Sequence, residues 1–159
     1  MAWSCTAASQ PMQHFCRSAE PPKLGRRTAS ASIMASPFIR VLIVDDDRDA
    51  AICLKTLLEA AGCEVRGVVM PTNAVAIGRE LQPDAALVDI IMPGGNGYRV
   101  IRQLRCEFPE MTIVAYSGWG RQEDEDAAVA AGADRFLSKP ATFDQIRQAL
   151  LAGRCATAM

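Results

Sequence analysis

Two kinds of apolar segment alternate along the chain from residue 39 onward. Short runs such as "IRVLIV" (39–44) are typical of strands that are buried on both faces of a sheet. Between them lie longer stretches in which apolar residues recur at helical spacing. The expected strands are 39–44, 63–69, 84–90, 111–117 and 133–138, and the expected helices are 48–61, 72–81, 97–108, 123–132 and 143–152.

Five strand–helix units in series predict an α/β fold. Regular alternation of strands and helices implies a parallel sheet with helices on both faces and right-handed crossovers. We therefore expect a flavodoxin-like, doubly wound (βα)5 three-layer sandwich with the strand order 2-1-3-4-5. This domain would span residues 39–153.

Several residues mark the ends of the expected helices. Gly62 and Gly132 follow the first and fourth helices, where a left-handed residue commonly ends a helix. Thr142 is suited to cap the last helix, and the acids at 123–126 crowd the positive end of the fourth helix dipole. In the first helix, the stripe expected to face the core consists of Ile52, Leu54, Leu57, Leu58 and Ala61.

Residues 1–38 differ in composition from the rest of the chain. They are rich in Ala, Ser and Pro and show no sustained period, which is typical of a disordered leader. An organelle transit peptide, or a true translation start at Met34, would also fit. The leader holds 4 of the 17 cations but only 1 of the 18 acids, so the remainder is acidic. Residues 154–159 are expected to be a tail, with no output domain after the fold.

Composition narrows the classes of function. Half of the residues are hydrophobic and the formal net charge is -1, as expected of a soluble globular protein. No apolar run approaches the roughly 20 residues of a membrane span, and the chain is not basic enough to imply direct nucleic acid binding. The six cysteines lack CxxC spacing and His14 is the sole histidine, which argues against a zinc site. We expect free, buried thiols, Cys53 and Cys63 among them, and hence a reducing compartment, the cytoplasm.

Polar residues stand at the ends of four of the five expected strands. In strand order they are Asp45 and Asp46, then Asp89, then Ser117, then Lys139. Ligands of open parallel sheets bind beyond the carboxyl ends of the strands, so we expect these side chains to converge there. Several hard oxygen ligands suit Mg²⁺, which would also offset the repulsion between neighbouring carboxylates.

Four motifs occur in order at these strand ends. They are "VDD" at 44–46, "DIIMPGGNG" at 89–97, the strand-end serine, and "KP" at 139–140. Together they resemble the receiver domain of two-component response regulators, in particular the single-domain, chemotaxis-regulator type. The resemblance covers residues 39–153. It implies a phosphoacceptor signalling protein, not an enzyme for a separate substrate, that catalyses only its own phosphorylation and dephosphorylation.

The resemblance assigns a role to each member of the acidic cluster. Asp89 would be the phosphoacceptor, which takes the phosphoryl group from a phosphohistidine and forms an acyl phosphate. Asp46 and Asp89 would bind Mg²⁺ directly, and Asp45 would do so through water or in part. The backbone carbonyl of Ile91 would complete the protein's share of the ligands.

The remaining implied roles concern the switch and the partners. Lys139 would pair with the phosphoryl oxygens, and its bond to Pro140 would be cis. Ser117 would hydrogen-bond the phosphoryl group, and the ring of Phe136 would follow that hydroxyl. The expected partners are a histidine kinase or histidine phosphotransferase and a downstream protein effector. No direct nucleic acid or membrane contact is expected.

Two positions depart from the common receiver pattern. Ile91 lies two residues after Asp89, and Trp119 lies two residues after Ser117. In the family these two positions are often occupied by polar residues. Bulky apolar groups there should obstruct the water that hydrolyses the acyl phosphate, so we expect a long-lived phosphoform. Asp47 and Asp49 are interpreted as charges at a helix N-terminus, not as metal ligands.

Two other functions fit part of the sequence. A haloacid-dehalogenase-like phosphatase would use Asp45 as nucleophile and Asp47 as acid/base, although Asp49 replaces the Thr or Val usual in its motif. A receiver fold that is never phosphorylated would act as an interaction module. Phosphate uptake by Asp45, and not by Asp89, would indicate the phosphatase. Unchanged partner binding by an Asp89→Asn variant would indicate the interaction module.

Overall fold

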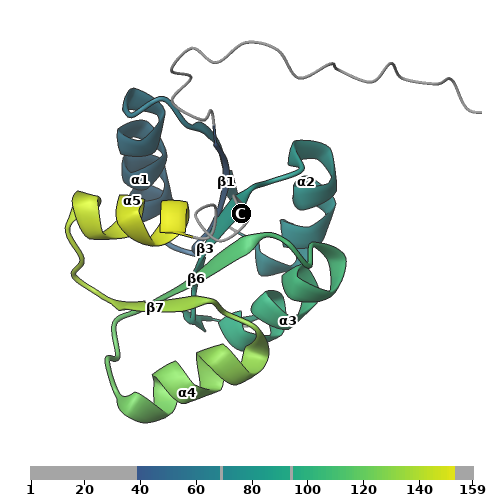
Figure 1. The fold of residues 1–159 in the computed structure, drawn as a ribbon, viewed down its shortest axis with the longest axis vertical. Coiled ribbons are helices and arrows are strands. Elements are labelled where there is room, and N and C mark those ends of the chain that lie inside the picture. Colours follow the sequence, from purple (N-terminus) through teal and green to yellow (C-terminus); the bar gives the residue numbers. More distant parts are fainter. Residues whose placement is uncertain (1–38, 69, 94, 153–159) are drawn as a thin grey trace, which may run out of the picture. The chain divides into compact units, whose positions relative to one another are not determined.

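The computed structural model describes residues 39–68, 70–93 and 95–152, and in Figure 1 these form a sheet with helices on both of its faces. The sheet strands are β1 (Arg40–Val44), β2 (Glu64–Val68), β3 (Ala85–Asp89), β6 (Thr112–Ser117) and β7 (Arg135–Ser138). The helices are α1 (Arg48–Ala60), α2 (Ala74–Leu81), α3 (Gly97–Glu107), α4 (Gln122–Ala131) and α5 (Phe143–Leu151). Three short elements complete the fold: the 3-10 helix η1 (Pro71–Asn73) and the two-residue strands β4 (Ile91–Met92) and β5 (Gly95–Asn96).

The sheet has the order β2-β1-β3-β6-β7, and each neighbouring pair is parallel. Counted among these five strands alone, this is the order 2-1-3-4-5, so the predicted fold class is confirmed. The direction of winding reverses between β1 and β3, whose ends are in register at Val44 and Val88. Ligands of such sheets bind at this reversal, and Asp45 and Asp89 each stand one residue beyond it.

Two apolar clusters, one on each face of the sheet, form the core. On β1, Leu42 and Val44 pack into the cluster that α2, α3 and α4 cover. Val41 and Ile43 pack into the opposite cluster, under α1 and α5. Residues of a strand point alternately to its two faces, so a strand covered on both sides needs apolar residues throughout. This accounts for the uninterrupted apolar run before Asp45.

The helix ends follow their predicted signals. Asp47 caps α1, because its side chain accepts hydrogen bonds from the amides of Asp49 and Ala50 at 3.0 and 3.2 Å. Thr142 forms a capping box with Gln145 at the start of α5. Gly132 follows α4 with a φ of 109°, a conformation that residues with a side chain rarely adopt. The expected helix-charge role of Asp47 therefore has a geometric basis.

The predicted core face of α1 is partly wrong. Leu58 is buried and Leu54 packs against the core, but Ile52 is 52% exposed and Leu57 is 44% exposed. The residues that face the sheet are Ala51, Leu54 and Leu58, which recur at intervals of three and four. Ile52 and Leu57 lie outside this narrow stripe and contribute apolar surface instead.

The expectation of buried thiols is also wrong for two cysteines. Cys53 and Cys106 are exposed, whereas Cys63 is half-buried; all three are free. Cys53 lies beside Ile52 on the outer side of α1, so the same error in the helix face explains its exposure. The side chains of Cys5, Cys16 and Cys155 belong to residues that the structure does not describe, as do His14, the leader 1–38 and the tail 154–159.

One local element was not expected from the sequence. The strands β4 and β5 form a short antiparallel ribbon in which Ile91 pairs with Asn96 and Met92 with Gly95. The ribbon returns the chain to the sheet edge, where the amide of Gly97 donates to the carbonyl of Ile90 at 3.2 Å. None of the described helices has the length and apolar character that a bilayer span requires.

Candidate functional site

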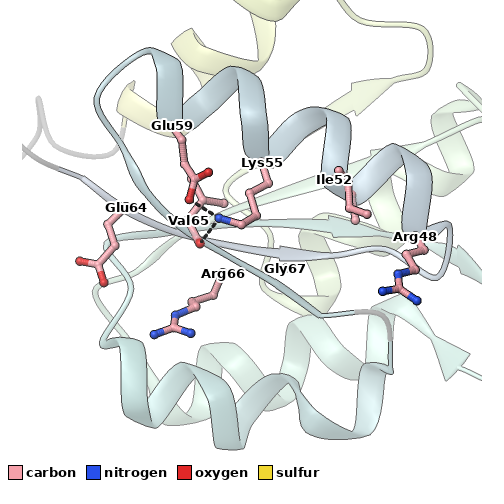
Figure 2. A pocket seen from close by; sticks show the side chains of 9 residues that line it. Arg48, Ile52, Lys55, Glu59, Glu64, Val65, Arg66 and Gly67 are labelled. Carbon is pink, nitrogen blue, oxygen red and sulfur yellow. Dashed lines mark hydrogen bonds and ion pairs between the residues drawn. The ribbon is translucent and has the colours of Figure 1, made fainter.

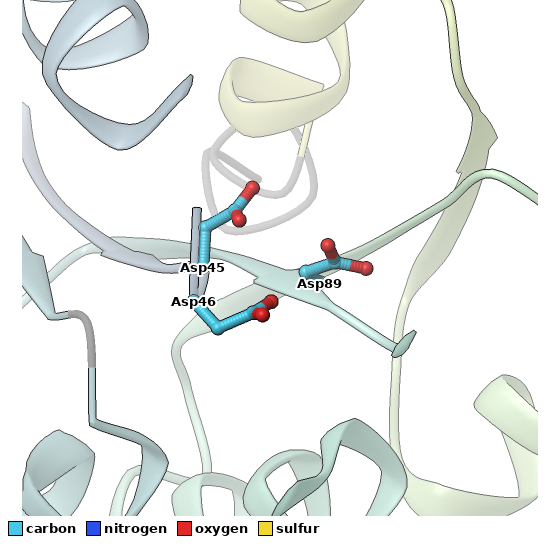
Figure 3. A group of neighbouring side chains, drawn as sticks. All are labelled: Asp45, Asp46 and Asp89. Carbon is cyan, nitrogen blue, oxygen red and sulfur yellow. The ribbon is translucent and has the colours of Figure 1, made fainter. Parts of the chain in front are cut away.

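Three aspartates from two neighbouring strands meet at the carboxyl edge of the sheet (Figure 3). Asp45 and Asp46 follow β1, and Asp89 is the last residue of β3. One carboxylate oxygen from each lies within 4.8 Å of the others. The structure therefore brings together all three acids that were predicted to share a cation.

Backbone amides orient two of these carboxylates. Asp45 Oδ1 accepts a hydrogen bond from the amide of Asp47 at 2.9 Å. Asp89 Oδ1 accepts one from the amide of Ile91, also at 2.9 Å. Each acid thus uses one oxygen to hold the turn that follows its strand, and this leaves its second oxygen for the site.

Lys139 reaches two of the acids from the end of the terminal strand β7. Its Nζ donates to Asp89 Oδ2 at 2.7 Å and lies 3.3 Å from Asp45 Oδ2. The lysine follows β7, and its backbone amide donates to the carbonyl of Ser117 on β6 at 2.6 Å. This backbone bond anchors the lysine to the strand beside β3, within reach of Asp89.

Two carboxylates of the site are buried, and this burial affects the pKa values of the charged groups around them. Asp45 is 2% exposed and Asp89 is 7% exposed. Burial raises the pKa of Asp45; the Asp47 amide and Lys139 oppose the rise, and the charge of Asp89 adds to it. Burial alone would lower the pKa of Lys139, but its hydrogen bond to Asp89 and the charges of both acids outweigh burial and raise it. Lys139 is therefore held as a cation.

Ser117 ends β6 and is 1% exposed. In this structure its Oγ accepts a hydrogen bond from the amide of Trp119 at 3.1 Å. The hydroxyl hydrogen is still available as a donor, because a hydroxyl has one donor and two acceptor positions. Ser117 pairs in register with Ser138, the residue before Lys139, so hydroxyl and ammonium lie on adjacent strand ends.

The other residues singled out in the sequence lie around this edge. Phe136 on β7 is half-buried and packs against the apolar cluster under α2, α3 and α4. The peptide bond between Lys139 and Pro140 is cis. Ile91 and Trp119 follow Asp89 and Ser117 by two residues and are 40% and 57% exposed.

Two residues at the site were given no role of their own in the sequence analysis. The ring centroid of Tyr116 lies 4.8 Å from Lys139 Nζ, a cation–π contact that helps position the lysine. In the sequence Tyr116 looks like any core residue of a strand. At Gly97 a Cβ atom would lie only 2.2 Å from the carbonyl oxygen of Asp89, so only glycine fits there. The final Gly of "DIIMPGGNG" was a signal for this second residue.

The donor set fits a hard divalent cation. Three carboxylates with oxygens this close repel one another unless a cation or protons intervene, and Lys139 supplies only one positive charge. Mg²⁺ takes oxygen ligands, typically one or two protein carboxylates together with water. Among the described residues this is the group of side chains with the spacing of a metal site.

Comparison with known proteins places this site in context. The chain is 37% identical over 112 residues to the chemotaxis protein CheY of Thermotoga maritima, an alignment that covers 70% of this chain and 93% of CheY. It is 35% identical over 122 residues to the transcriptional regulatory protein PrrA of Mycobacterium leprae, which covers 75% of this chain and 52% of PrrA. It thus spans about half the length of such regulators. Because PrrA is a transcriptional regulatory protein, the expected absence of nucleic acid contact is not supported.

Solved structures of the same fold include close matches in shape. A CheY-like receiver domain protein from Methanospirillum hungatei aligns with a TM-score of 0.68 at 26% identity, over 75% of this chain and 98% of that one. A response regulator from Burkholderia pseudomallei aligns with a TM-score of 0.68 at 27% identity, over 74% of this chain and 71% of that one. Its structure was solved with a phosphorylated aspartic acid, a calcium ion and citrate.

The match also holds at the level of the family. Residues 41–151, which include every site residue described above, match the response regulator receiver domain. Fold, strand order and the placement of the acids at the sheet edge agree with this match. The chain belongs to the response regulator receiver domain family, whose members act as phosphoacceptors in two-component signalling.

Proposed function

We propose that Asp89 is the residue that accepts the phosphoryl group. The observation that carries this proposal is the position of Asp89 between two fixed donors: the Ile91 amide on Oδ1 and Lys139 Nζ on Oδ2. A carboxylate oxygen of Asp89 attacks phosphorus, the bond from phosphorus to the donor's imidazole nitrogen breaks, and an acyl phosphate forms. Catalysis of such a transfer rests mainly on positioning and charge neutralisation.

The acids that surround Asp89 would hold a divalent metal ion. Asp46 and Asp89 would bind Mg²⁺ directly, with Asp45 acting through water or in part and with the carbonyl of Ile91 as a further ligand. When bound, the ion neutralises charge on the transferring phosphoryl group. Asp45 has a similar pair of donors, but it lies farther from Lys139 (3.3 Å against 2.7 Å) and is less exposed than Asp89 (2% against 7%), so its position suits an outer ligand better than a nucleophile.

Lys139 and Ser117 would bind the phosphoryl oxygens once Asp89 is modified. Lys139 then exchanges its bond with Asp89 Oδ2 for one with the phosphoryl group, and the Ser117 hydroxyl donates its hydrogen to another oxygen. Ser117 is the last residue of β6, and Lys139 directly follows β7. The new charge at Asp89 would therefore attract the ends of these two strands toward the phosphoryl group. Phe136 on β7 would change its packing in response and carry the signal to the surface around α4, β7 and α5.

The Burkholderia pseudomallei relative supports the assignment, since its structure contains both a phosphorylated aspartic acid and a divalent ion. We propose that residues 39–153 form the phosphoaccepting unit in the cytoplasm. A histidine kinase or histidine phosphotransferase would supply the phosphoryl group, and the signal would pass to a downstream protein. The support for a contact with nucleic acid is limited to the transcriptional regulators among the relatives of the chain.

The phosphatase alternative is not retained. The chain belongs to the receiver family, and Asp47, its required acid/base, is exposed and used as the cap of α1. The unphosphorylated interaction module remains a distinct outcome of the experiment that follows.

Incubation with acetyl phosphate and Mg²⁺, followed by intact mass measurement, tests the proposal. The wild-type chain should gain one phosphoryl group, and Asp89→Asn should gain none. Asp49→Asn is the matched control, because Asp49 is exposed on α1 and should not affect uptake. Uptake by Asp89→Asn would contradict the assignment, and no uptake by the wild type would favour the interaction module.

A further inference from the structure

Among the described residues, the outer edge of β2 has no strand partner. β2 is the terminal strand of the sheet, and within the described part of the chain it pairs only with β1. The amide of Glu64 donates to the carbonyl of Ile39 at 3.0 Å, so the backbone groups of Glu64 face β1. Backbone groups alternate in direction along a strand, and those of Val65 and Gly67 therefore point outward, away from the sheet.

A groove of about 700 Å³ runs along this edge between β2 and α1 (Figure 2). Lys55 crosses it, with its Nζ paired with Glu59 and 3.4 Å from the carbonyl of Val65. That carbonyl can accept a second hydrogen bond, because a carbonyl oxygen has two lone pairs. At Gly67 a Cβ atom would meet nothing within 4 Å, so another backbone can approach closely. Ile52 on α1 is half-exposed beside the groove.

The side chains on the edge strand carry opposite charges at a spacing of two. Glu64 and Arg66 lie on the same face of β2 and are exposed. Neither side chain has an ion-pair partner among the residues that the structure describes. A strand with the order acid, apolar, base complements an antiparallel copy of itself.

We propose that the β2 edge docks the β2 edge of a second copy of this chain, antiparallel, about a two-fold axis at Val65. In this register the two Val65 residues exchange backbone hydrogen bonds. Glu64 of each copy then lies opposite Arg66 of the other, which gives two cross-strand pairs of opposite charge. A shift of the axis to Arg66 would place the two arginines opposite each other, so the charges select the first register.

This surface is separate from the phosphoacceptor. The acids meet at the carboxyl edge, around β1 and β3, whereas the pairing edge runs along the outer side of β2 (Figures 2 and 3). A dimer of this kind leaves Asp89 accessible, and the inference stands whether or not Asp89 accepts a phosphoryl group.

Sedimentation equilibrium of the full, unphosphorylated chain tests the proposal through charge reversal. Arg66→Glu turns both cross-strand pairs from attractive to repulsive and should raise the dimer dissociation constant about tenfold or more. Glu64→Arg should do the same, and the swapped variant E64R/R66E should restore dimerisation. Arg135→Glu, on the opposite terminal strand β7, is the matched control and should have no effect. Thermal unfolding of each variant shows that it is folded.

Amide hydrogen exchange gives a second, independent readout. Protection of the Val65 amide should increase with protein concentration in the wild type and in the swapped variant, but not in Arg66→Glu. A chain that remains monomeric up to about 1 mM, a dimer that Arg66→Glu leaves intact, or a dimer that Arg135→Glu disrupts would overturn the proposal. So would a swapped variant that fails to recover, since complementary charges would then not be the cause.

Discussion

At the scale of single residues, the site depends on one cation placed between two acids. Lys139 lies 2.7 Å from Asp89 Oδ2 and 3.3 Å from Asp45 Oδ2, and the ring of Tyr116 lies beneath its ammonium group. The lysine thus orients Asp89, while its second contact offsets the charge of Asp45. A buried carboxylate without such a partner would take up a proton and lose its nucleophilicity.

Gly97 is the residue whose substitution should disturb this arrangement most directly. In Gly97→Ala the new Cβ would lie 2.2 Å from the Asp89 carbonyl oxygen and 2.5 Å from Ile90 Cα, both backbone atoms that cannot turn aside. We expect a loss of about 1–3 kcal/mol in the free energy of unfolding and slower uptake of phosphate. Urea unfolding and intact mass measure the two effects.

Gly118→Ala is the control for that substitution. Gly118 also lies beside the site, but a Cβ atom there meets nothing within 4 Å. Its free energy of unfolding should stay within about 0.5 kcal/mol of wild type. Equal losses in the two variants would show that steric conflict at Gly97 is not the cause.

The lifetime of the phosphoform is expected to depend on Ile91 and Trp119. Both side chains are apolar, exposed and within two residues of a site residue, where they should obstruct the approach of water to the acyl phosphate. Ile91→Asn and Trp119→Glu should therefore shorten the half-life of phosphorylated Asp89, measured by loss of phosphoryl mass over time. Val129→Asn, an exposed apolar position on α4, is the control and should leave it unchanged. A wild-type half-life of seconds, equal to that of both variants, would refute this expectation.

At the scale of elements, Arg105 links several segments at the end of the sheet opposite the site. Arg105 of α3 donates to the carbonyls of Gly132, Pro109 and Met111 at 3.0, 2.6 and 2.8 Å. It also pairs with Asp134 at 2.6 Å. These bonds tie α3 to the turn that follows α4 and to the segment before β6, and so they fix the two connections that set the position of β6 and β7.

Arg105→Ala should destabilise the fold without altering the chemistry. Loss of four hydrogen bonds from a largely covered side chain should lower the free energy of unfolding by about 2–3 kcal/mol. Phosphate uptake by the folded fraction should match that of wild type. Arg102→Ala, an exposed arginine on the same helix, should change stability by less than about 0.5 kcal/mol. A similar loss in both variants would show that removal of any arginine side chain from α3, not the bonds of Arg105, is responsible, since alanine itself favours a helix.

At the scale of the whole molecule, the sheet edge concentrates negative charge that the fold must tolerate. The two core clusters bury both faces of the sheet, and the fold thereby places carboxylate oxygens of the acids at the ends of β1 and β3 within 4.8 Å of each other. An unfolded chain would separate these charges. A cation that binds only the folded arrangement should therefore stabilise the whole domain.

Addition of Mg²⁺ should raise the thermal midpoint of the wild-type chain. At ten times the dissociation constant the stabilisation is about 1.4 kcal/mol, and EDTA should remove it. Asp46→Ala should abolish the increase because it takes away a proposed direct ligand. Asp47→Ala should retain it, since Asp47 caps α1, although this variant will be less stable overall. An equal Mg²⁺ increment in Asp46→Ala and wild type would exclude Asp46 as a ligand.

Much of the fold could be predicted because its causes are local. The three inner strands β1, β3 and β6 are mostly apolar, and the predicted bounds of each of the five strands lie within two residues of those observed. Gly62, Gly132 and Thr142 end or begin helices as their backbone and side-chain preferences require. The face of α1 was misjudged because Ile52 and Leu57 are apolar yet lie outside the stripe that the sheet covers. Helical spacing alone does not say how wide that stripe is.

The sequence by itself determined the order of strands and helices, the fold class and the residues that stand at each strand end. These follow from hydrophobic periodicity and from motif order, which are properties of the chain. Tertiary structure alone decided the contacts of Lys139 with two acids, the ring of Tyr116 beneath it and the close approach at Gly97. Such contacts join residues from different strands, and their distances depend on how the sheet twists and how the helices pack. The edge position of β2 already followed from the predicted strand order, whereas the groove between β2 and α1 depends on how the helix packs and was shown only by the tertiary structure.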